Sequence, residues 1–321
     1  MEYNIVVNGL GHAFLREFGC PCERCRDLSH VANTSVSVIA TDTAGDVTWH
    51  ALVDCGLGVV TSLCNTFAPE ETRLDWLLFT HWHSDHSLEL NRLCETLQRL
   101  ARVRGVPFTH IPTWCRSGSA QWLQKRYSYE WYRCLKPVIS DTGEMPGTVL
   151  NPLPLNTKEI TITPVSVSHC SADIDPATFK DRVFCSACFV IETNGRKAVL
   201  LWDLDKFNEW IVDPVRDEER KAYKLLRGTD YLFIDCFNWT VEAAAGRNTG
   251  HISFATVKRY ANTLAPSKTL LMHMSGHEGG EKSPGWGWSN RQWEEESQKV
   301  WTREALPGVV KVPEIGETFA L

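Results

Sequence analysis

Residues 80–86, THWHSDH, place three histidines and one aspartate directly after the short apolar run LDWLLFT (74–80). The run predicts a buried strand, because it is short, apolar and flanked by polar residues. Imidazole nitrogens bind zinc and similar cations, and carboxylates suit the same or harder ions. In an extended loop, His81 and His83 project to one side and can bind one ion, while Asp85 and His86 on the next turn can serve a second. The alternative is a polar strand-to-helix turn in which Asp85 caps the next helix.

Apolar runs of strand length fall into two groups along the chain, each accompanied by predicted helices. Strands are expected within residues 4–11, 35–42, 46–56, 74–80, 159–169, 188–194, 197–205, 230–237, 268–275 and 309–313, and helices near 87–102, 253–264 and 291–303. Two sheets sandwiched between helices account for this pattern, and no Pro/Ser-rich linker marks a boundary. We expect one α/β domain over residues 1–321, with a less regular insert at about 105–150 and a Trp-rich segment at about 283–303.

Composition and charge limit the classes of function. The 321-residue chain has a net charge of −6, so bulk nucleic-acid binding, which depends on Lys and Arg, is not expected. No apolar run reaches the ~18 residues of a membrane span, and the N-terminus lacks the pattern of a signal peptide. The twelve cysteines are therefore expected to be reduced thiols or metal ligands in a cytoplasmic protein. We expect a small-molecule substrate, for which an anion would suit bound cations, and leave a homodimer open.

The motif H-x-H-x-D-H resembles that of the metallo-β-lactamase superfamily, and the resemblance covers most of the chain. LVDCGLG (52–58) is similar to the family's strand and Asp-x-Gly turn before the motif. VSVSH, AVLLWD and KTLLMH end predicted strands with candidate ligands, namely His169, Asp203 and His273. The resemblance implies a four-layer αββα sandwich. It also implies the following metal ligands: His81, His83 and His169 for one ion, Asp85, His86 and His273 for the other, and Asp203 as the bridge, with Asp205 as the alternative bridge.

A pair of divalent ions (Zn or Mn, with Fe as a further option) implies hydrolysis by a hydroxide that the two ions supply. Asp85 can also hold the attacking water by a hydrogen bond. Family members that cleave phosphodiesters carry a histidine in a Gly-His segment between the bridging aspartate and the last ligand. NTGHISFATV (248–257) is similar to that segment, which implies that His251 is a general acid or a phosphate contact. The alternative is a histidine that stabilises the entry of a helix.

Three cysteines, Cys20, Cys22 and Cys25, lie close together in GCPCERC (19–25). A redox dithiol would need a strand-to-helix context and a low-pKa thiol, and nothing nearby indicates either. Within the superfamily, C-x-C-x-x-C resembles the structural zinc motif of PhnP-like cyclic phosphodiesterases and of PqqB-like proteins, and the intact H-x-H-x-D-H favours the PhnP-like branch. A structural zinc needs four ligands. The resemblance implies His277, in HMSGH (273–277), as the fourth, with His30 as the alternative.

A second C-x-x-C pair, Cys185 and Cys188, falls within an apolar run, VFCSACFVI (183–191). Side chains three apart on a strand point to opposite faces. We therefore expect these two cysteines in the core.

The most specific functional prediction is a dinuclear metal phosphodiesterase that acts on a cyclic or small phosphodiester. Trp82 inside the motif, and Trp286 and Trp288 in SPGWGWSNRQW (283–293), are candidates to line a pocket for an aromatic or bulky group. Such a pocket would suit the second hypothesis, a metallo-hydrolase of a thioester, a lactone or another small organic substrate. A third is a non-catalytic metalloprotein, and the retention of all seven candidate ligands argues against it.

Overall fold

Two mixed β-sheets form the centre of the computed structural model, which describes residues 1–141, 144–169, 171–193, 195–240, 250–275, 277 and 281–321. Within these residues the first sheet has the order β13-β1-β2-β3-β4-β5-β6, and the second has the order β12-β11-β10-β9-β8-β7. The strands are β1 (Glu2–Gly9), β2 (Ser35–Thr41), β3 (Val47–Val53), β4 (Trp76–Leu78), β5 (Ile111–Arg116), β6 (Leu135–Ser140), β7 (Thr161–Val167), β8 (Ser186–Glu192), β9 (Lys197–Leu201), β10 (Tyr231–Asp235), β11 (Lys268–Met272), β12 (Val309–Lys311) and β13 (Thr318–Ala320). The four-layer sandwich that the sequence predicts is confirmed.

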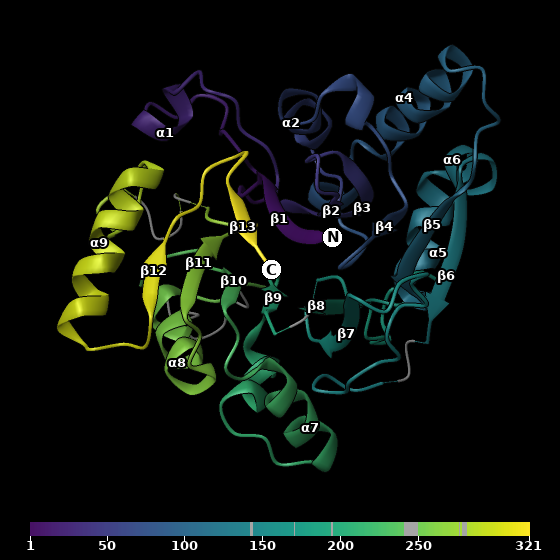
Figure 1. Cartoon of the computed structure of the whole chain (residues 1–321). Helices are drawn as coiled ribbons and strands as arrows, with labels where there is room; N and C mark the ends of the chain where they lie inside the picture. The colour runs from purple at the N-terminus through teal and green to yellow at the C-terminus, as the bar shows by residue number, and fades with distance from the viewer. Residues whose placement is uncertain (142–143, 170, 194, 241–249, 276, 278–280) are drawn as a thin grey trace.

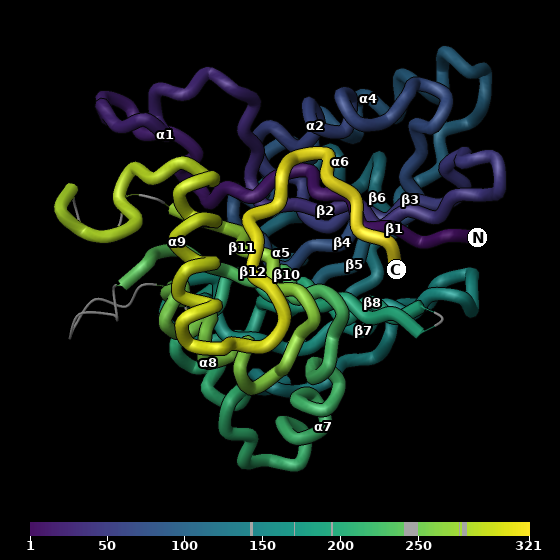
Figure 2. Tube along the Cα trace, turned by 60° about the vertical axis from the view of Figure 1, so that its left-hand side comes forward, coloured from purple at the N-terminus to yellow at the C-terminus, as the bar shows by residue number. Residues whose placement is uncertain are grey.

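Helices cover the outer faces of both sheets. Figure 2 shows α2 and α4 above the first sheet, and α7 and α8 below the second. The helices are α1 (Glu23–Arg26), α2 (Val59–Thr66), α3 (Ser84–Ser87), α4 (Leu90–Val103), α5 (Ser117–Arg126), α6 (Ser128–Arg133), α7 (Asp217–Leu226), α8 (Phe254–Leu264) and α9 (Asn290–Arg303), with the 3₁₀ turns η1 (Pro69–Glu71) and η2 (Lys206–Ile211). Of the helices in the described ranges, none is long and apolar enough to cross a membrane.

Strand alternation explains why both faces of the first sheet are apolar. On β3, Ala51 and Val53 face the second sheet, while Leu52 faces the helices α2 and α4. On β4, Leu78 likewise faces the second sheet, and Leu77 faces the helices. Successive side chains of a strand point to opposite faces, so a sheet covered on both sides needs near-continuous apolar runs. The core therefore has a layer between the sheets and a layer under the helices.

The structure differs from the sequence-based expectation in three places. Residues 105–150 are more regular than expected, since they supply β5 and β6 of the first sheet together with α5 and α6. The predicted helix near 87–102 is two helices, α3 and α4, separated at Leu88 and Glu89. The unpredicted strand β13 pairs antiparallel with β1 and brings the two termini side by side (Figure 1).

The carboxyl ends of the parallel strands converge at one edge of the sandwich. Strand β3 is parallel to β4, and β9, β10 and β11 are parallel to one another. Every candidate metal ligand lies in a segment that follows β4, β7, β9 or β11. The fold thus collects residues 80–86, 169, 203 and 273 at one place.

A buried polar network crosses the first sheet at His50 on β3. Its Nδ1 donates to the Arg73 carbonyl at 2.8 Å, and its Nε2 lies 2.8 Å from Ser37 Oγ on β2. Asn8 on β1 extends the network, because its side-chain amide donates to Ser37 Oγ at 3.0 Å. Burial lowers the pKa of His50 to about 4. The imidazole is therefore neutral in the fold near pH 7 and gains its proton more readily on unfolding.

The low pKa of His50 predicts acid-sensitive stability. Between pH 7.5 and 5.5 the unfolded state takes up a proton at this site that the folded state does not, so the wild type should lose about 1 kcal/mol more than His50→Gln. Unfolding free energies from urea titrations at both pH values, on metal-loaded protein, measure the difference. His110→Gln, at an exposed position, is the control. An identical pH dependence of wild type and His50→Gln would contradict the assignment.

Candidate metal centre

The structure brings the seven predicted ligands together in two adjoining groups. His81, His83 and His169 form one, and Asp85, His86, Asp203 and His273 form the other, each with its potential ligand atoms within 4.8 Å of one another. All seven are buried except His83, which is half-buried. Rings from the two groups are adjacent, with 4.3 Å between the ring centroids of His81 and His86.

Asp203 lies between the two groups. Its Oδ2 is 3.0 Å from His86 Nε2, and its Oδ1 is 3.3 Å from His273 Nε2 and 3.6 Å from His169 Nε2. Asp205, the alternative bridge, lies elsewhere: it accepts from Ser168 Oγ at 2.9 Å and from the Phe207 amide at 2.8 Å. The position of Asp203 is the one a bridging carboxylate needs, whereas Asp205 starts η2.

The hydrogen bonds of the imidazoles fit metal ligation through Nε2. His86 Nδ1 donates to Asp54 Oδ2 at 2.7 Å, and His169 Nδ1 donates to the Gly250 carbonyl at 2.8 Å. His81 Nδ1 lies 3.2 Å from Thr80 Oγ1, and His273 Nδ1 lies 3.0 Å from Thr34 Oγ1. Each threonine hydroxyl donates its own proton elsewhere, to Asp54 and to the Gly11 carbonyl respectively, so it accepts from the histidine. In their neutral forms, all four imidazoles therefore have the lone pair on Nε2.

Unpaired buried atoms at the centre of the cluster are consistent with this ligation. Among the described residues, Nε2 of His81, His86 and His273 and Oδ2 of Asp203 are buried without a hydrogen-bond partner. Buried polar atoms are normally satisfied, so four such atoms at one point call for a ligand. A set of imidazole nitrogens and carboxylate oxygens suits a divalent cation such as zinc. The residues present fit a metal site.

The charges of the cluster lead to the same conclusion. Burial lowers the pKa of His81 and of His169 well below the ordinary value, so both imidazoles are neutral. For Asp203, burial acts to raise the pKa, but the imidazoles led by His273 and His86 hold it well below the ordinary value. For His86, burial acts to lower the pKa, but the carboxylates led by Asp203 and Asp85 raise it well above the ordinary value. A cation at His86 Nε2 displaces a proton, so metal binding is coupled to proton release.

Sequence reasoning missed the role of Asp54, although LVDCGLG contains it. Its carboxylate is fully buried and accepts from Thr80 N and Oγ1, from His86 Nδ1 and from Trp202 Nε1, at 2.7–3.0 Å. The glycine of the same Asp-x-Gly turn, Gly56, is required for space, because a Cβ there would lie 1.8 Å from the Asp85 carbonyl oxygen. The turn after β3 thus holds the metal loop against the sheet.

His251 lies at the edge of the cluster, where it contacts two carboxylates. Its Nδ1 is 3.2 Å from Asp235 Oδ2 and 3.6 Å from Asp203 Oδ1. Its ring stacks on Phe237, with centroids 4.3 Å apart, and on His273, with centroids 5.0 Å apart. Asp235 ends β10, and no sequence motif marked it. A histidine held by a carboxylate beside a metal site is placed for proton transfer.

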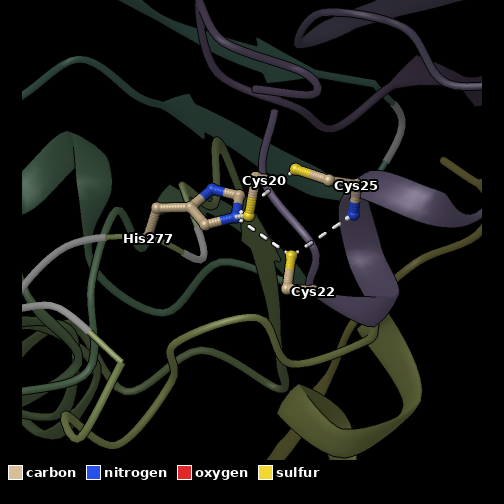
Figure 3. Close-up of side chains that lie close together, drawn as sticks. All are labelled: Cys20, Cys22, Cys25 and His277. Carbon is tan, nitrogen blue, oxygen red and sulfur yellow. Dashed lines mark hydrogen bonds between the residues drawn. The ribbon is translucent and has the colours of Figure 1, made fainter. Parts of the chain in front are cut away.

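The three N-terminal cysteines form a second cluster with His277. Figure 3 shows the imidazole edge of His277 directed at the three sulfurs. The distances from Nε2 are 3.5 Å to Cys20 Sγ, 3.1 Å to Cys22 Sγ and 3.4 Å to Cys25 Sγ. His30 lies elsewhere, with its Nε2 2.8 Å from Ser62 Oγ. Three thiols and one imidazole converging on one point are a closed set of the kind that holds a structural zinc.

The other predicted cysteines lie in the core, whereas Trp82 lies beside the metal cluster. Cys185 and Cys188 are buried and free, which confirms that they belong to the core. Trp82 lies at the metal cluster, with its ring 4.6 Å from that of His83. Its other described ring contact is a parallel stack on Trp122, with centroids 4.2 Å apart, which the sequence did not indicate.

The other two candidate pocket tryptophans lie beside different groups. Trp286 packs edge-on against His277 of the cysteine cluster, with centroids 5.7 Å apart. Trp288 packs against Trp239 and Trp293. Within the described part of the chain, their ring contacts are with these residues and not with the His/Asp cluster.

Comparisons with known proteins agree with this fold. A family model described as "Beta-lactamase superfamily domain" matches residues 50–274. The metallo-β-lactamase fold protein YhfI from Bacillus subtilis aligns over 100% of both chains at 16% identity, with a TM-score of 0.62. A new diphosphatase from the PhnP family aligns over 100% of this chain and 98% of its own at 17% identity, with a TM-score of 0.64.

Zn²⁺-bound PqqB from Methylobacterium extorquens aligns over 99% of this chain and 100% of its own at 14% identity, with a TM-score of 0.63. No curated protein sequence matches. At such identities the structural likeness establishes the fold alone, while the family match covers the segment that carries all seven ligands. The chain therefore belongs to the metallo-β-lactamase superfamily, and its site is that of a metal-dependent hydrolase.

Proposed function

We propose that this protein is a dinuclear metal phosphodiesterase that acts on a cyclic or otherwise small phosphodiester. The observation that carries the proposal is the position of His251. Its side chain is held by Asp235 and stacks on Phe237 and on His273, at the edge of a complete ligand set. An alkoxide leaving group needs a proton, and this imidazole supplies a donor that the metal ligands do not.

Each residue near the centre has a distinct task in this proposal. Two divalent cations, Zn or Mn or alternatively Fe, would lower the pKa of a shared water and stabilise charge on the phosphoryl oxygens. Asp85 would accept a hydrogen bond from the attacking water, since its carboxylate is ionised: burial raises its pKa, but His86 outweighs this and holds it low. His251 Nε2 would give its proton to the leaving oxygen, because Nδ1 faces Asp235.

The pKa of His251 supports this role. Burial acts to lower it, but Asp235, followed by Asp203 and Asp85, raises it to about 9. The imidazole thus holds a proton near neutral pH, as a general acid must. Cations at the neighbouring ligands would reduce that preference, which brings the pKa closer to the working pH.

A second candidate function, hydrolysis of a thioester, a lactone or another small organic substrate, draws support from the aromatic pair beside His83. Trp82 stacks on Trp122 with an interplanar angle of 13°, and Phe179 packs edge-on against Trp122 at 5.6 Å. Aromatic surfaces of this kind bind planar or apolar groups. The diphosphatase of the PhnP family shares the fold, and its described activity makes phosphoanhydrides a useful addition to the assay panel.

The cysteine cluster is proposed to hold one structural zinc. Cys20, Cys22, Cys25 and His277 offer four ligand atoms, the number that a structural zinc needs, so the ion would have no open position for substrate. Residues far apart in sequence would be joined by this ion, because the cysteines precede β2 and His277 follows β11. We therefore propose three metal ions per chain.

The substrate class is tested with metal-loaded protein. We expect turnover of bis(p-nitrophenyl) phosphate and 2′,3′-cyclic nucleotides, loss of activity after chelation, and recovery with Zn²⁺ or Mn²⁺. Asp203→Asn should lower kcat/KM by at least ~100-fold, the upper range for altering even an indirect partner of a metal. Asp213→Asn, at an exposed position, is the matched control. Turnover of thioesters or lactones without phosphodiesters would replace this proposal with the second candidate.

The role of His251 predicts a dependence on the leaving group. His251→Gln should lower kcat/KM for 2′,3′-cyclic nucleotides, which expel an alkoxide, by ~100-fold or more. The loss for bis(p-nitrophenyl) phosphate should be under ~10-fold, because nitrophenolate leaves without a proton. Asp235→Asn should lower kcat/KM for the two substrates in the same direction as His251→Gln does. Neither substitution should change the metal content. Equal losses for both substrates would rule out the general-acid role.

The zinc assignment predicts that the ion at the cysteine cluster can be removed without removing the two ions at the His/Asp cluster. Cys22→Ser should remove one of three zinc equivalents and lower the thermal midpoint, since a structural zinc contributes directly to folding free energy. The control is Cys64→Ser, at an exposed free cysteine on α2, which should keep all three equivalents. Metal analysis by mass spectrometry, together with thermal unfolding, measures both effects. Retention of three equivalents in Cys22→Ser would refute the assignment.

A further inference from the structure

His12, which follows β1, is a buried histidine beside the metal cluster that is not a member of either ligand group. It is 2% exposed. Its ring packs edge-on against Phe237, with centroids 5.2 Å apart, and against His273, with centroids 6.3 Å apart. Phe237 and His273 are also the rings on which His251 stacks. His12 therefore contacts the proposed last metal ligand, His273, and shares both ring neighbours with the proposed general acid.

The backbone around His12 is fixed to the same strand end. The His12 carbonyl accepts from Asn33 Nδ2 at 2.7 Å. Gly11 forms isolated bridges with Asn33 and with Met274, the residue after His273. The Gly11 carbonyl also accepts from Thr34 Oγ1, the hydroxyl that orients His273. The backbone that carries His12 is thus tied to the strand end that carries His273.

The tautomer of His12 is opposite to that of the metal ligands. The Phe14 amide donates to His12 Nδ1 at 3.2 Å, so Nδ1 carries the lone pair and a neutral ring carries its proton on Nε2. Because Nδ1 accepts this hydrogen bond, it carries no proton, and the ring is therefore neutral. His12 therefore presents an N–H donor at Nε2, where the ligand histidines present lone pairs.

That donor has no acceptor within the described ranges of the chain. His12 Nε2 is buried and lacks a hydrogen-bond partner there. An unsatisfied buried donor costs ~1–3 kcal/mol of folding free energy, and in native proteins it calls for a specific explanation. Each of the other unpaired imidazole nitrogens at this centre is explained by a cation. A protonated nitrogen cannot ligate a cation, so His12 needs an oxygen acceptor.

We propose that His12 Nε2–H donates a hydrogen bond to a phosphoryl oxygen of the substrate bound at the metal centre. The inference deepens the proposed function and takes its substrate class from it. A neutral donor suits this position, because it stabilises an anionic oxygen without adding positive charge next to two cations. Such preorganised donors act most strongly where charge develops in the transition state. His12 would then be a substrate-contacting residue that acts together with His251, with which it shares the ring neighbours Phe237 and His273.

The test compares metal-loaded wild type with His12→Phe, which keeps a buried ring without the donor, and His12→Gln, which restores a donor. We expect His12→Phe to lower kcat for 2′,3′-cyclic nucleotides by ~100-fold, in the range for loss of one oxyanion donor. His12→Gln should recover at least ~10-fold of that loss. Inorganic phosphate, titrated calorimetrically, should bind His12→Phe at least ~10-fold more weakly than wild type. His110→Gln, at an exposed position, is the control and should match wild type.

The phosphate titration separates this inference from the proposed function. One outcome is that the wild type turns over no phosphodiester, while His12→Phe still binds phosphate more weakly than the wild type. In that case the proposed function fails and the His12 contact stands. Equal phosphate affinity of wild type and His12→Phe, or no phosphate binding to the metal-loaded wild type, overturns the contact. Loss of a metal equivalent in His12→Phe also overturns it, because His12 would then be a ligand. ¹⁵N NMR of the wild type should show His12 protonated on Nε2, and a proton on Nδ1 would equally refute it.

Discussion

The carboxylate of Asp54 is the constraint on which the active centre depends. A carboxylate inside a protein is costly unless hydrogen bonds replace its hydration, and Asp54 is fully buried. Four donors satisfy it: the Thr80 amide and hydroxyl, His86 Nδ1 and Trp202 Nε1. These donors lie on both sides of the sandwich, so one buried carboxylate holds both the loop after β4 and the strand end that carries Asp203.

From that anchor the orientation of the imidazoles follows by hydrogen-bond logic. Thr80 gives its proton to Asp54 and so accepts from His81, while His86 donates to Asp54 directly. Thr34 on the neighbouring segment plays the same part for His273. Backbone geometry supports these positions, because Asp54, Asp203 and His273 all adopt positive φ near +60°. Such conformations are uncommon for residues with a side chain and gather at functional sites.

The sequence was sufficient to predict which residues gather in the two His/Asp groups and insufficient to predict their hydrogen-bond partners. His81 to His86 are local in sequence, and Asp203 and His273 each follow an apolar strand run, so pattern and resemblance find them. Asp235 and His12 carry no local signal, because their roles depend on which strands and loops become neighbours. Residues 105–150 were expected to be irregular, because their many aromatic side chains, several of which pack under α4–α6, obscure the strand pattern of the two short strands β5 and β6 in the sequence. β13 is only three residues long and gains its pairing from β1 at the other end of the chain.

The cysteine cluster and the metal centre are joined by direct contacts between the segments that carry them. The segment from Gly11 to Cys25 is joined to residues 273–277 at three points: the Gly11–Met274 bridge, the bond from Arg24 Nη2 to the Met274 carbonyl at 3.0 Å, and the contact of the cysteines with His277. A short loop of this kind has little apolar surface of its own to hold it, since Phe14 and Phe18 are exposed. An ion that ties the cysteines to His277 would therefore restrain the loop that carries His12, and through Gly11 and Thr34 the ring of His273. The cysteine cluster, which catalyses no reaction itself, would in this way help to position the side chains of the metal centre.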